Sequence, residues 1–112
     1  MHIELRKAGD VVIVDLSGKL SAGLGDQILR ETIDELLGEN WKKILLNLSE
    51  VSFVDSAGLG ELVAGLRTAQ RFGARLKLLN SNERVQSTLY MSRLLPIFEI
   101  YQDEREALNQ FN

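Results

Sequence analysis

Hydrophobic and polar residues near the start of the chain are arranged as in two neighbouring strands. Residues 3–7 (IELRK) alternate between apolar and polar side chains, whereas residues 11–18 (VVIVDLSG) begin with a continuous apolar run. Alternation is typical of a strand with one solvated face, and an apolar run is typical of a buried strand. Because Ala8-Gly9-Asp10 separates the two segments, the sequence predicts a β-hairpin with a tight turn.

The spacing of apolar residues then changes to the three-to-four-residue period of helices. Residues 25–40 (GDQILRETIDELLGEN) have this period, with Gly38 as the expected stop. The period returns over residues 59–72, where Gly73 is expected to end the helix. Between these helices, residues 42–48 (KKILLNL) are apolar on both faces, as expected for a central strand that is covered above and below.

The C-terminal third of the chain repeats this alternation. Residues 75–79 (RLKLL) predict a strand, residues 82–94 (NERVQSTLYMSRL) a third helix, and residues 97–101 (IFEIY) a strand after Pro96. Residues 103–111 (DEREALNQF) predict a short helix with acidic residues in its first turn, which is the favourable end of the helix dipole.

Helices that alternate with hydrophobic strands favour an α/β fold, in which the helices pack on a mostly parallel sheet. We predict one domain over residues 1–112, with a mixed, mostly parallel central sheet, an N-terminal hairpin and about four helices. The hydrophobic content of 45% and the charged content of 26% are those of a globular chain. A chain of 112 residues can also bury a core without a metal ion or a disulfide.

Composition excludes several classes of site. The chain has no cysteine, which removes thiolate nucleophiles and cysteine-based zinc sites. Its net charge of -3 gives no basic surplus for phosphate backbones, so we expect no direct nucleic-acid partner. No apolar stretch approaches the roughly 20 residues of a membrane span, and residues 1–10 lack the apolar core of a signal peptide. The prediction is a cytoplasmic protein without a membrane span.

Catalytic motifs in the sequence are incomplete. Ser56 stands two residues before Gly58, but Val54 occupies the place where a nucleophile elbow needs glycine, and the only histidine is His2 at the terminus. Residues 17–20 (SGKL) lack the remaining residues of a phosphate-binding loop. Four carboxylates are scattered without metal-ligand spacing and are interpreted as solvated: Asp10, Asp15, Asp26 and Asp55. We predict neither an enzyme nor a cofactor site.

Two surface features have ordinary structural interpretations. Tyr90 and Met91, beside the apolar face of the third helix, are interpreted as the margin of the core. Cations near the end of the second helix could form a basic stripe, although cations in that position also complement the helix dipole. These cations are Arg67, Arg71, Arg75 and Lys77.

The pair Asp55-Ser56 lies between an apolar strand and a glycine-spaced helix. Either side chain can cap the helix by accepting a hydrogen bond from a free N–H group. Capping does not explain the glycines that follow, since each glycine inside a helix costs roughly 0.5 to 1 kcal/mol relative to alanine. Small residues here leave backbone bare at a surface that a partner or a kinase could reach, so both interpretations stay open. These residues are Gly58, Gly60, Ala64 and Gly65.

The segment VSFVDSAGLG, residues 51–60, resembles the signature of the anti-sigma factor antagonists, the stand-alone bacterial STAS domains. LSGKL, ILLNLSEVSFVDSAGLG and VQSTLYMSRLLPIF follow one another in the family's order and spacing, so the resemblance covers the whole chain and implies the STAS fold. The chain departs from the family at three positions. Ala57 replaces a usual Ser or Thr, Ser21 a common aspartate, and Arg93 a frequent glycine.

The resemblance implies a phosphorylation switch at Ser56. In the family, this serine is phosphorylated by an anti-sigma factor that is also a serine kinase, and a serine phosphatase restores the unmodified form. The unmodified protein binds the anti-sigma factor and frees the sigma factor. The implied partner-binding residues are Ser21, Asp55, Ser56, Ala57, Gly58, Gly60 and Ala64.

Two other functions stay open. STAS-like domains also act as constitutive subunits of larger signalling or lipid-transport assemblies, and a small nucleotide-binding module is the third possibility. Modification of Ser56 separates the first function from the second, and nucleotide titration of the purified protein tests the third.

Overall fold

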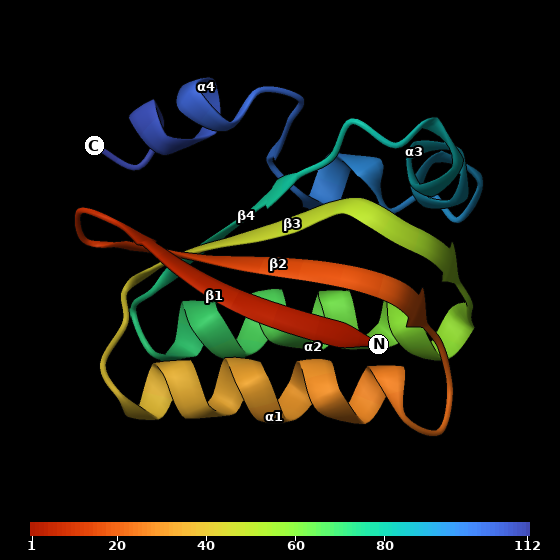
Figure 1. The fold of residues 1–112 in the computed structure, drawn as a ribbon, viewed down its shortest axis with the longest axis horizontal. Helices are drawn as coiled ribbons and strands as arrows, with labels where there is room; N and C mark the ends of the chain where they lie inside the picture. The colour runs from red at the N-terminus through yellow and green to blue at the C-terminus, as the bar shows by residue number, and fades with distance from the viewer.

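A computed structural model describes residues 1–112 as a five-stranded sheet with helices on both faces (Figure 1). The elements in chain order are β1 (His2–Ala8), β2 (Val11–Leu20), α1 (Gly25–Gly38), β3 (Lys43–Val54), α2 (Ser56–Arg71), β4 (Arg75–Leu79), α3 (Glu83–Met91), a 3-10 helix (Leu95–Ile97), β5 (Ile100–Tyr101) and α4 (Glu104–Asn109). The strand order is β1-β2-β3-β4-β5; β1 and β2 are antiparallel, and the other neighbouring strands are parallel. The predicted fold class is confirmed.

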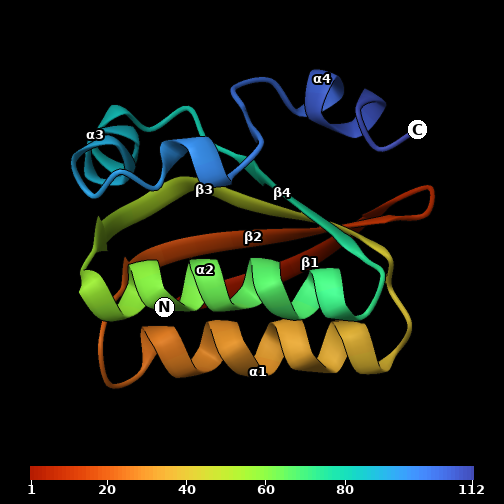
Figure 2. The same ribbon diagram turned by 180° about the vertical axis from the view of Figure 1, so that it is seen from behind.

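Helices α1 and α2 lie side by side on one face of the sheet, and α3 and α4 lie on the other face (Figure 1, Figure 2). This arrangement explains the continuous apolar run of β2, because successive side chains point to opposite faces of a strand. Val12 and Val14 belong to the larger hydrophobic cluster, whereas Val11 and Ile13 belong to a smaller cluster with Phe111, next to α4. Both faces of this strand are therefore core.

The segment before α4 differs from the prediction. A strand was expected over residues 97–101, but residues 95–97 form the 3-10 helix, and only Ile100 and Tyr101 pair with β4. Pro96 lies inside that short helix, because it has no N–H group to give to a strand ladder and its fixed φ suits a helical turn. The predicted strand is thus reduced to a two-residue edge.

Three helices are followed, two residues after their last residue, by a residue with left-handed backbone conformation. For α2 this residue is Gly73 (φ 70), as expected. Helix α1 ends at Gly38 as expected, and the left-handed residue after it is Asn40 (φ 71); after α3 it is Arg93 (φ 61). After Arg93, the Leu94 N–H donates to the Leu89 carbonyl, the bond that closes a Schellman motif. Arg93 thus occupies a conformation that favours glycine.

The suggested basic stripe is not one surface. Arg67 and Arg71 are exposed on α2, and Arg71 is the one in its last turn. Arg75 and Lys77 lie on β4 and contact residues on the opposite face, since the Arg75 guanidinium donates to the Phe111 carbonyl and Lys77 pairs with Glu99. Burial lowers the pKa of Lys77, which is 5% exposed. The helix-dipole interpretation therefore applies to the α2 residues alone.

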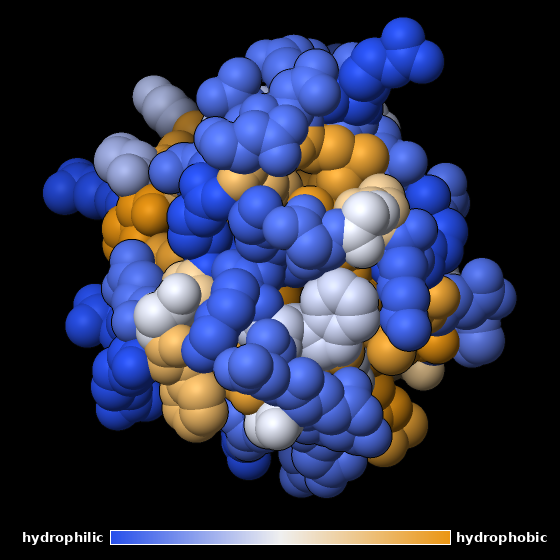
Figure 3. Space-filling view, turned by 90° about the vertical axis from the view of Figure 1, so that its left-hand side faces the viewer, coloured by the Kyte–Doolittle hydropathy of each residue, from blue (hydrophilic) through white to orange (hydrophobic).

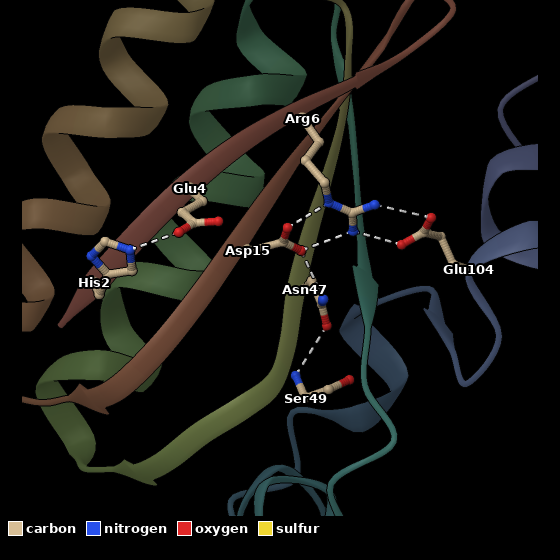
Figure 4. Close-up of polar contacts among 7 residues, drawn as sticks. All are labelled: His2, Glu4, Arg6, Asp15, Asn47, Ser49 and Glu104. Atoms are coloured by element: carbon tan, nitrogen blue, oxygen red, sulfur yellow. Dashed lines mark hydrogen bonds and ion pairs between the residues drawn. The ribbon is translucent and has the colours of Figure 1, made fainter.

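Asp15 is not a freely solvated carboxylate. Arg6 donates to both of its oxygens, at 2.5 and 3.0 Å, and Asn47 donates to one of them at 2.8 Å (Figure 4). The same guanidinium reaches Glu104 at 2.6 Å, so the network joins β1, β2 and β3 to α4. Arg6, with Asn47, holds the pKa of Asp15 below its usual range. The earlier interpretation of Asp15 is therefore wrong.

Candidate functional site

The candidate site lies where two central strands end. Leu20, the last residue of β2, is paired with Val54, the last residue of β3. Parallel strands end at the same edge of a sheet, which places the β2–α1 loop beside the N-terminus of α2, on the right in Figure 1. The Asp55 N–H also donates to the Leu20 carbonyl at 3.3 Å. Ser21 and Asp55-Ser56 are thereby brought together from distant parts of the sequence.

Asp55 is the N-cap of α2. Its Oδ1 accepts a hydrogen bond from the Gly58 N–H at 2.9 Å, and its Oδ2 accepts one from the Ala22 N–H at 2.9 Å. These backbone N–H groups, with Ala22 first, hold the pKa of the Asp55 carboxyl below its usual range. Both oxygens are thus engaged within the chain, and the carboxylate fixes the helix start against the β2–α1 loop. The capping interpretation is confirmed for Asp55.

Ser56 is the first residue of α2 and is exposed. Its hydroxyl has no hydrogen-bond partner in the chain, because the capping bond is made by the residue before it. Capping therefore does not explain this hydroxyl. Ser56 is a reachable nucleophilic oxygen held on a rigid, anchored turn.

Gly58 does not expose backbone to a partner, contrary to the expectation from the sequence. It is buried, and a Cβ atom at this position would overlap the carbonyl oxygen of Leu20. Gly65 is also buried, and a Cβ atom there would meet Ile33 of α1. These two glycines allow close packing inside the domain. Gly60 differs from both, since it is exposed and has no atom near the position of a Cβ.

The remaining predicted residues divide between two faces of α2. Ser56, Gly60 and Ala64 are spaced one turn apart and are all exposed, whereas Ala57 is half-buried. Ala64 lies two turns from Ser56 and lines a small pocket between α1 and α2. The same pocket is lined by Arg30 and Glu61, which form an ion pair with 2.6 Å between Nη2 and Oε1. The structure therefore places Ala64 on the same helix but outside the immediate surroundings of Ser56.

An open groove beside Ser56 was not predicted from the sequence. It has a volume of about 750 Å³ and lies between the start of α2 and one face of α3. Its walls are Val54, Asp55, Ser56 and Leu59 on one side and Glu83, Arg84, Ser87, Thr88, Met91 and Ser92 on the other. The groove residues of α3 are spaced at three- and four-residue steps. The sequence could therefore have indicated a second face of this helix, beside the buried face of Val85 and Leu89.

The interpretation of Tyr90 and Met91 as core margin is wrong. Their side chains are 69% and 79% exposed, and Met91 lines the groove. Phe53 near the end of β3 and Leu24 before α1 are also exposed at this edge of the sheet, by 49% and 62%. At the opposite end, around the hairpin turn, apolar side chains form separated patches among hydrophilic ones (Figure 3). Exposed apolar side chains thus lie at the same edge of the sheet as Ser56, and one of them, Met91, shares its groove.

Other chemistry is not assembled at this edge. His2 lies on β1, where it contacts Glu4 at 3.1 Å (Figure 4). No group of three or more His, Asp or Glu residues is arranged to hold a metal ion. None of the helices combines the length and the apolar character needed to cross a membrane.

Comparisons with known proteins identify the family of this chain. The family model of the STAS domain matches residues 2–107. The anti-sigma F factor antagonist of Paenibacillus polymyxa is 29% identical over 110 residues, which are 98% of this chain and 94% of that protein. A crystal structure of a candidate anti-sigma factor antagonist from Thermotoga maritima superposes with a TM-score of 0.87, at 29% identity over 96% of this chain and 92% of that one.

The phosphorylated form of the Bacillus cell fate determinant SpoIIAA has the same fold. Its TM-score is 0.73, at 23% identity over 99% of this chain and 100% of that chain. The matches extend over nearly the whole length of each protein, and the family model includes both the anchored Asp55 and the free Ser56. The chain belongs to the STAS domain family.

Proposed function

We propose that this protein is an anti-sigma factor antagonist that is switched off by phosphorylation of Ser56. The observation that carries the proposal is the Ser56 hydroxyl, which is exposed, free of hydrogen bonds and held at a helix start by the capping residue Asp55. The relatives named as anti-sigma factor antagonists support the partner class. The phosphorylated form of SpoIIAA supports modification as a property of a protein with this fold.

A phosphate on Ser56 suits a switch that leaves the domain folded. It adds about −1.5 to −2 charges at the N-terminus of α2, where the helix dipole favours an anion. Ser56 is exposed, so the modification buries no charge within the domain. A partner that covered this edge would have to desolvate the dianion beside the Asp55 carboxylate, which weakens association.

The proposed partner surface is centred on Ser56. It includes Gly60, where the missing side chain leaves room for a close contact, and the neighbouring residues Ser21, Asp55 and Ala57, with Ala64 at its margin. Gly58 supports this surface from inside, since the absence of a Cβ atom lets the start of α2 lie against the Leu20 carbonyl at the end of β2. The exposed side chains of Leu24, Phe53 and Met91 supply apolar contact area around it.

The partner in this proposal is an anti-sigma factor that is also a serine kinase. Transfer of the γ-phosphoryl group of ATP forms the Ser56 Oγ–P bond, breaks the bond to the leaving ADP, and releases the hydroxyl proton to a base of the kinase. ATP is bound by the kinase. A separate serine phosphatase hydrolyses phospho-Ser56 and restores the binding form.

Co-expression with candidate kinases from the same genome tests the proposal. We expect a mass increase of one phosphate by intact-mass spectrometry, which is lost in Ser56→Ala and retained in Ser87→Ala, whose hydroxyl lies in the same groove. Binding of the kinase to the unmodified protein and release after phosphorylation complete the expected result. A stable complex in which Ser56 is never modified would favour a constitutive subunit of a larger assembly.

A further inference from the structure

Arg84 is the one cationic side chain that lines the groove beside Ser56. It lies in the first turn of α3, and no carboxylate lies within ion-pair distance of its guanidinium. Its side-chain contact is a weak one, with Nη1 at 3.5 Å from the Ser52 carbonyl oxygen. Most of the donor capacity of this guanidinium is therefore unused.

Ser87 is the second free donor on the same wall. It follows Arg84 by three residues, which places both on one face of α3, and its hydroxyl has no partner in the chain. The other two hydroxyls of the wall are occupied, because Thr88 donates to the Arg84 carbonyl at 3.1 Å and Ser92 to the Thr88 carbonyl at 2.6 Å. Arg84 and Ser87 thus line the same groove as Ser56 and have unused N–H and O–H groups.

The charges of the groove favour an attached phosphate over a free one. Asp55 and Glu83 are the acidic residues of its lining and Arg84 is the basic one, so the unmodified groove carries a net negative charge. A free phosphate gains little from such a surface. A phosphate bonded to Ser56 is already confined to the groove, which gives it a high effective concentration for the guanidinium.

We propose that Arg84, assisted by Ser87, binds the phosphate of phospho-Ser56 and ties the start of α2 to α3. This inference rests on the proposed modification of Ser56. An arginine fork can bond two phosphate oxygens at once, and the bond offsets the repulsion between the phosphate and Asp55. Phosphorylation then closes the groove that Leu59 and Met91 line, so a partner loses this contact area as well as the neutral Ser56. The same contact shields the phosphate and slows its removal by a phosphatase.

The test uses full-length protein with phosphoserine inserted at position 56 during translation, so it does not depend on any kinase. The ³¹P NMR signal reports the second pKa of the phosphate, which is about 6 for an unperturbed phosphoserine. A nearby cation favours the dianion, so this pKa is expected to be at least about 0.5 units lower in the wild type than in Arg84→Gln. Ser87→Ala should raise it by less, and Arg84→Lys should recover part of the wild-type value.

The matched control is Arg67→Gln, which removes an exposed arginine of α2 outside the groove. It should leave the phosphate pKa unchanged, which separates local contact from net charge. Thermal unfolding of each variant confirms that it is folded, and inorganic phosphate added to the unmodified protein should not shift the α3 amide resonances.

Equal phosphate pKa values in the wild type, Arg84→Gln and Arg67→Gln would overturn the inference. If a kinase modifies Ser56 but these values are equal, only the role of Arg84 fails. If the values differ as expected but no kinase of the genome modifies Ser56, the proposed function fails and the phosphate-binding capacity of the groove stands.

Discussion

Asp15 and Asp55 are both carboxylates that accept hydrogen bonds on two oxygens, but their surroundings differ. Asp15 lies within β2 and accepts from the side chains of Arg6 and Asn47, so its charge is balanced inside a network that reaches α4 (Figure 4). Asp55 follows the end of β3 and accepts from two backbone N–H groups. The first carboxylate holds elements together, whereas the second fixes a turn on which the next residue is left free.

The difference explains why Ser56 suits regulation and Asp15 does not. A charge added near Asp15 would enter a closed set of ion pairs and disturb the contact between the sheet and α4. A charge added at Ser56 lies on an exposed residue at a helix N-terminus, so it changes the surface with little effect on the fold. Four predictions break or sharpen this comparison.

The largest expected effect is on the turn that Asp55 anchors. Gly58→Ala places a methyl group against the Leu20 carbonyl and should lower the free energy of unfolding by about 2–3 kcal/mol. Gly60→Ala, two residues on in the same helix, meets no atom and should raise it by roughly 0.5–1 kcal/mol. Urea unfolding measures both, and equal effects would mean that Gly58 is not under the inferred constraint.

The next effect is on binding. Ser56→Glu adds about half the charge of a phosphate and should weaken the anti-sigma factor complex at least tenfold, which is about 1.4 kcal/mol. Its melting temperature should hold or rise slightly, because the N-terminus of α2 favours the carboxylate. Isothermal titration calorimetry and thermal unfolding measure the two properties. Gln70→Glu, which adds the same charge near the other end of α2, should bind as the wild type does; an equal loss would point to net charge instead.

Breaking the Asp15 network should have a smaller effect on the free energy of unfolding, and this effect should depend on pH. Arg6→Ala should lower the free energy of unfolding by about 1 kcal/mol at pH 7, since the pairs are partly solvated. The pKa of Asp15 is lower in the folded state than its unfolded value of about 3.9, so this stabilisation is present above that pH and is lost as the pH falls through the folded pKa. The difference in free energy of unfolding between the wild type and Arg6→Ala should therefore become smaller from pH 7 to pH 2.

His2→Ala is the control for this pH series. This substitution removes the contact between His2 and Glu4, whose side chains are 70% and 69% exposed. It should change the free energy of unfolding little at either pH. If the difference in free energy of unfolding between the wild type and Arg6→Ala stayed constant from pH 7 to pH 2, Arg6 would act through packing rather than through the charge of Asp15.

The smallest effect concerns the end of α3, which forms one wall of the groove. Arg93→Gly should raise the free energy of unfolding by about 0.5–1 kcal/mol, because glycine adopts the left-handed conformation without the steric cost of a side chain. Asn40→Gly, at the equivalent position after α1, should gain less, since asparagine tolerates this conformation better. Thermal unfolding compares the two, and a loss of stability in Arg93→Gly would indicate an unseen role for the arginine side chain.

The fold was largely predictable because its signals are local. The runs at β2 and β3 were apolar on both faces, and Gly73 marked the end of α2 by its conformational freedom. The strand expected over residues 97–101 is shortened because Pro96 favours a helical turn, so the chain joins β4 only at Ile100 and Tyr101.

The site was predictable only in part, because its contacts join segments far apart in the chain, which a local pattern does not reveal. The sequence identified Asp55-Ser56 but did not decide which of the two residues caps the helix. That depends on the Ala22 and Gly58 N–H groups, which both donate to Asp55. The sequence could not place Leu20 against Gly58, since that contact joins segments far apart in the chain. The groove wall on α3 was missed because it forms only where α3 lies beside the start of α2, which again joins segments far apart in the chain.

The most direct measurement titrates the kinase identified by co-expression with unmodified protein and with protein that carries phosphoserine at position 56. We predict that the unmodified form binds, that the phosphorylated form binds at least tenfold more weakly, and that both forms melt within a few degrees of each other. Equal affinities for the two forms would contradict the central claim that charge at Ser56 controls the partner surface.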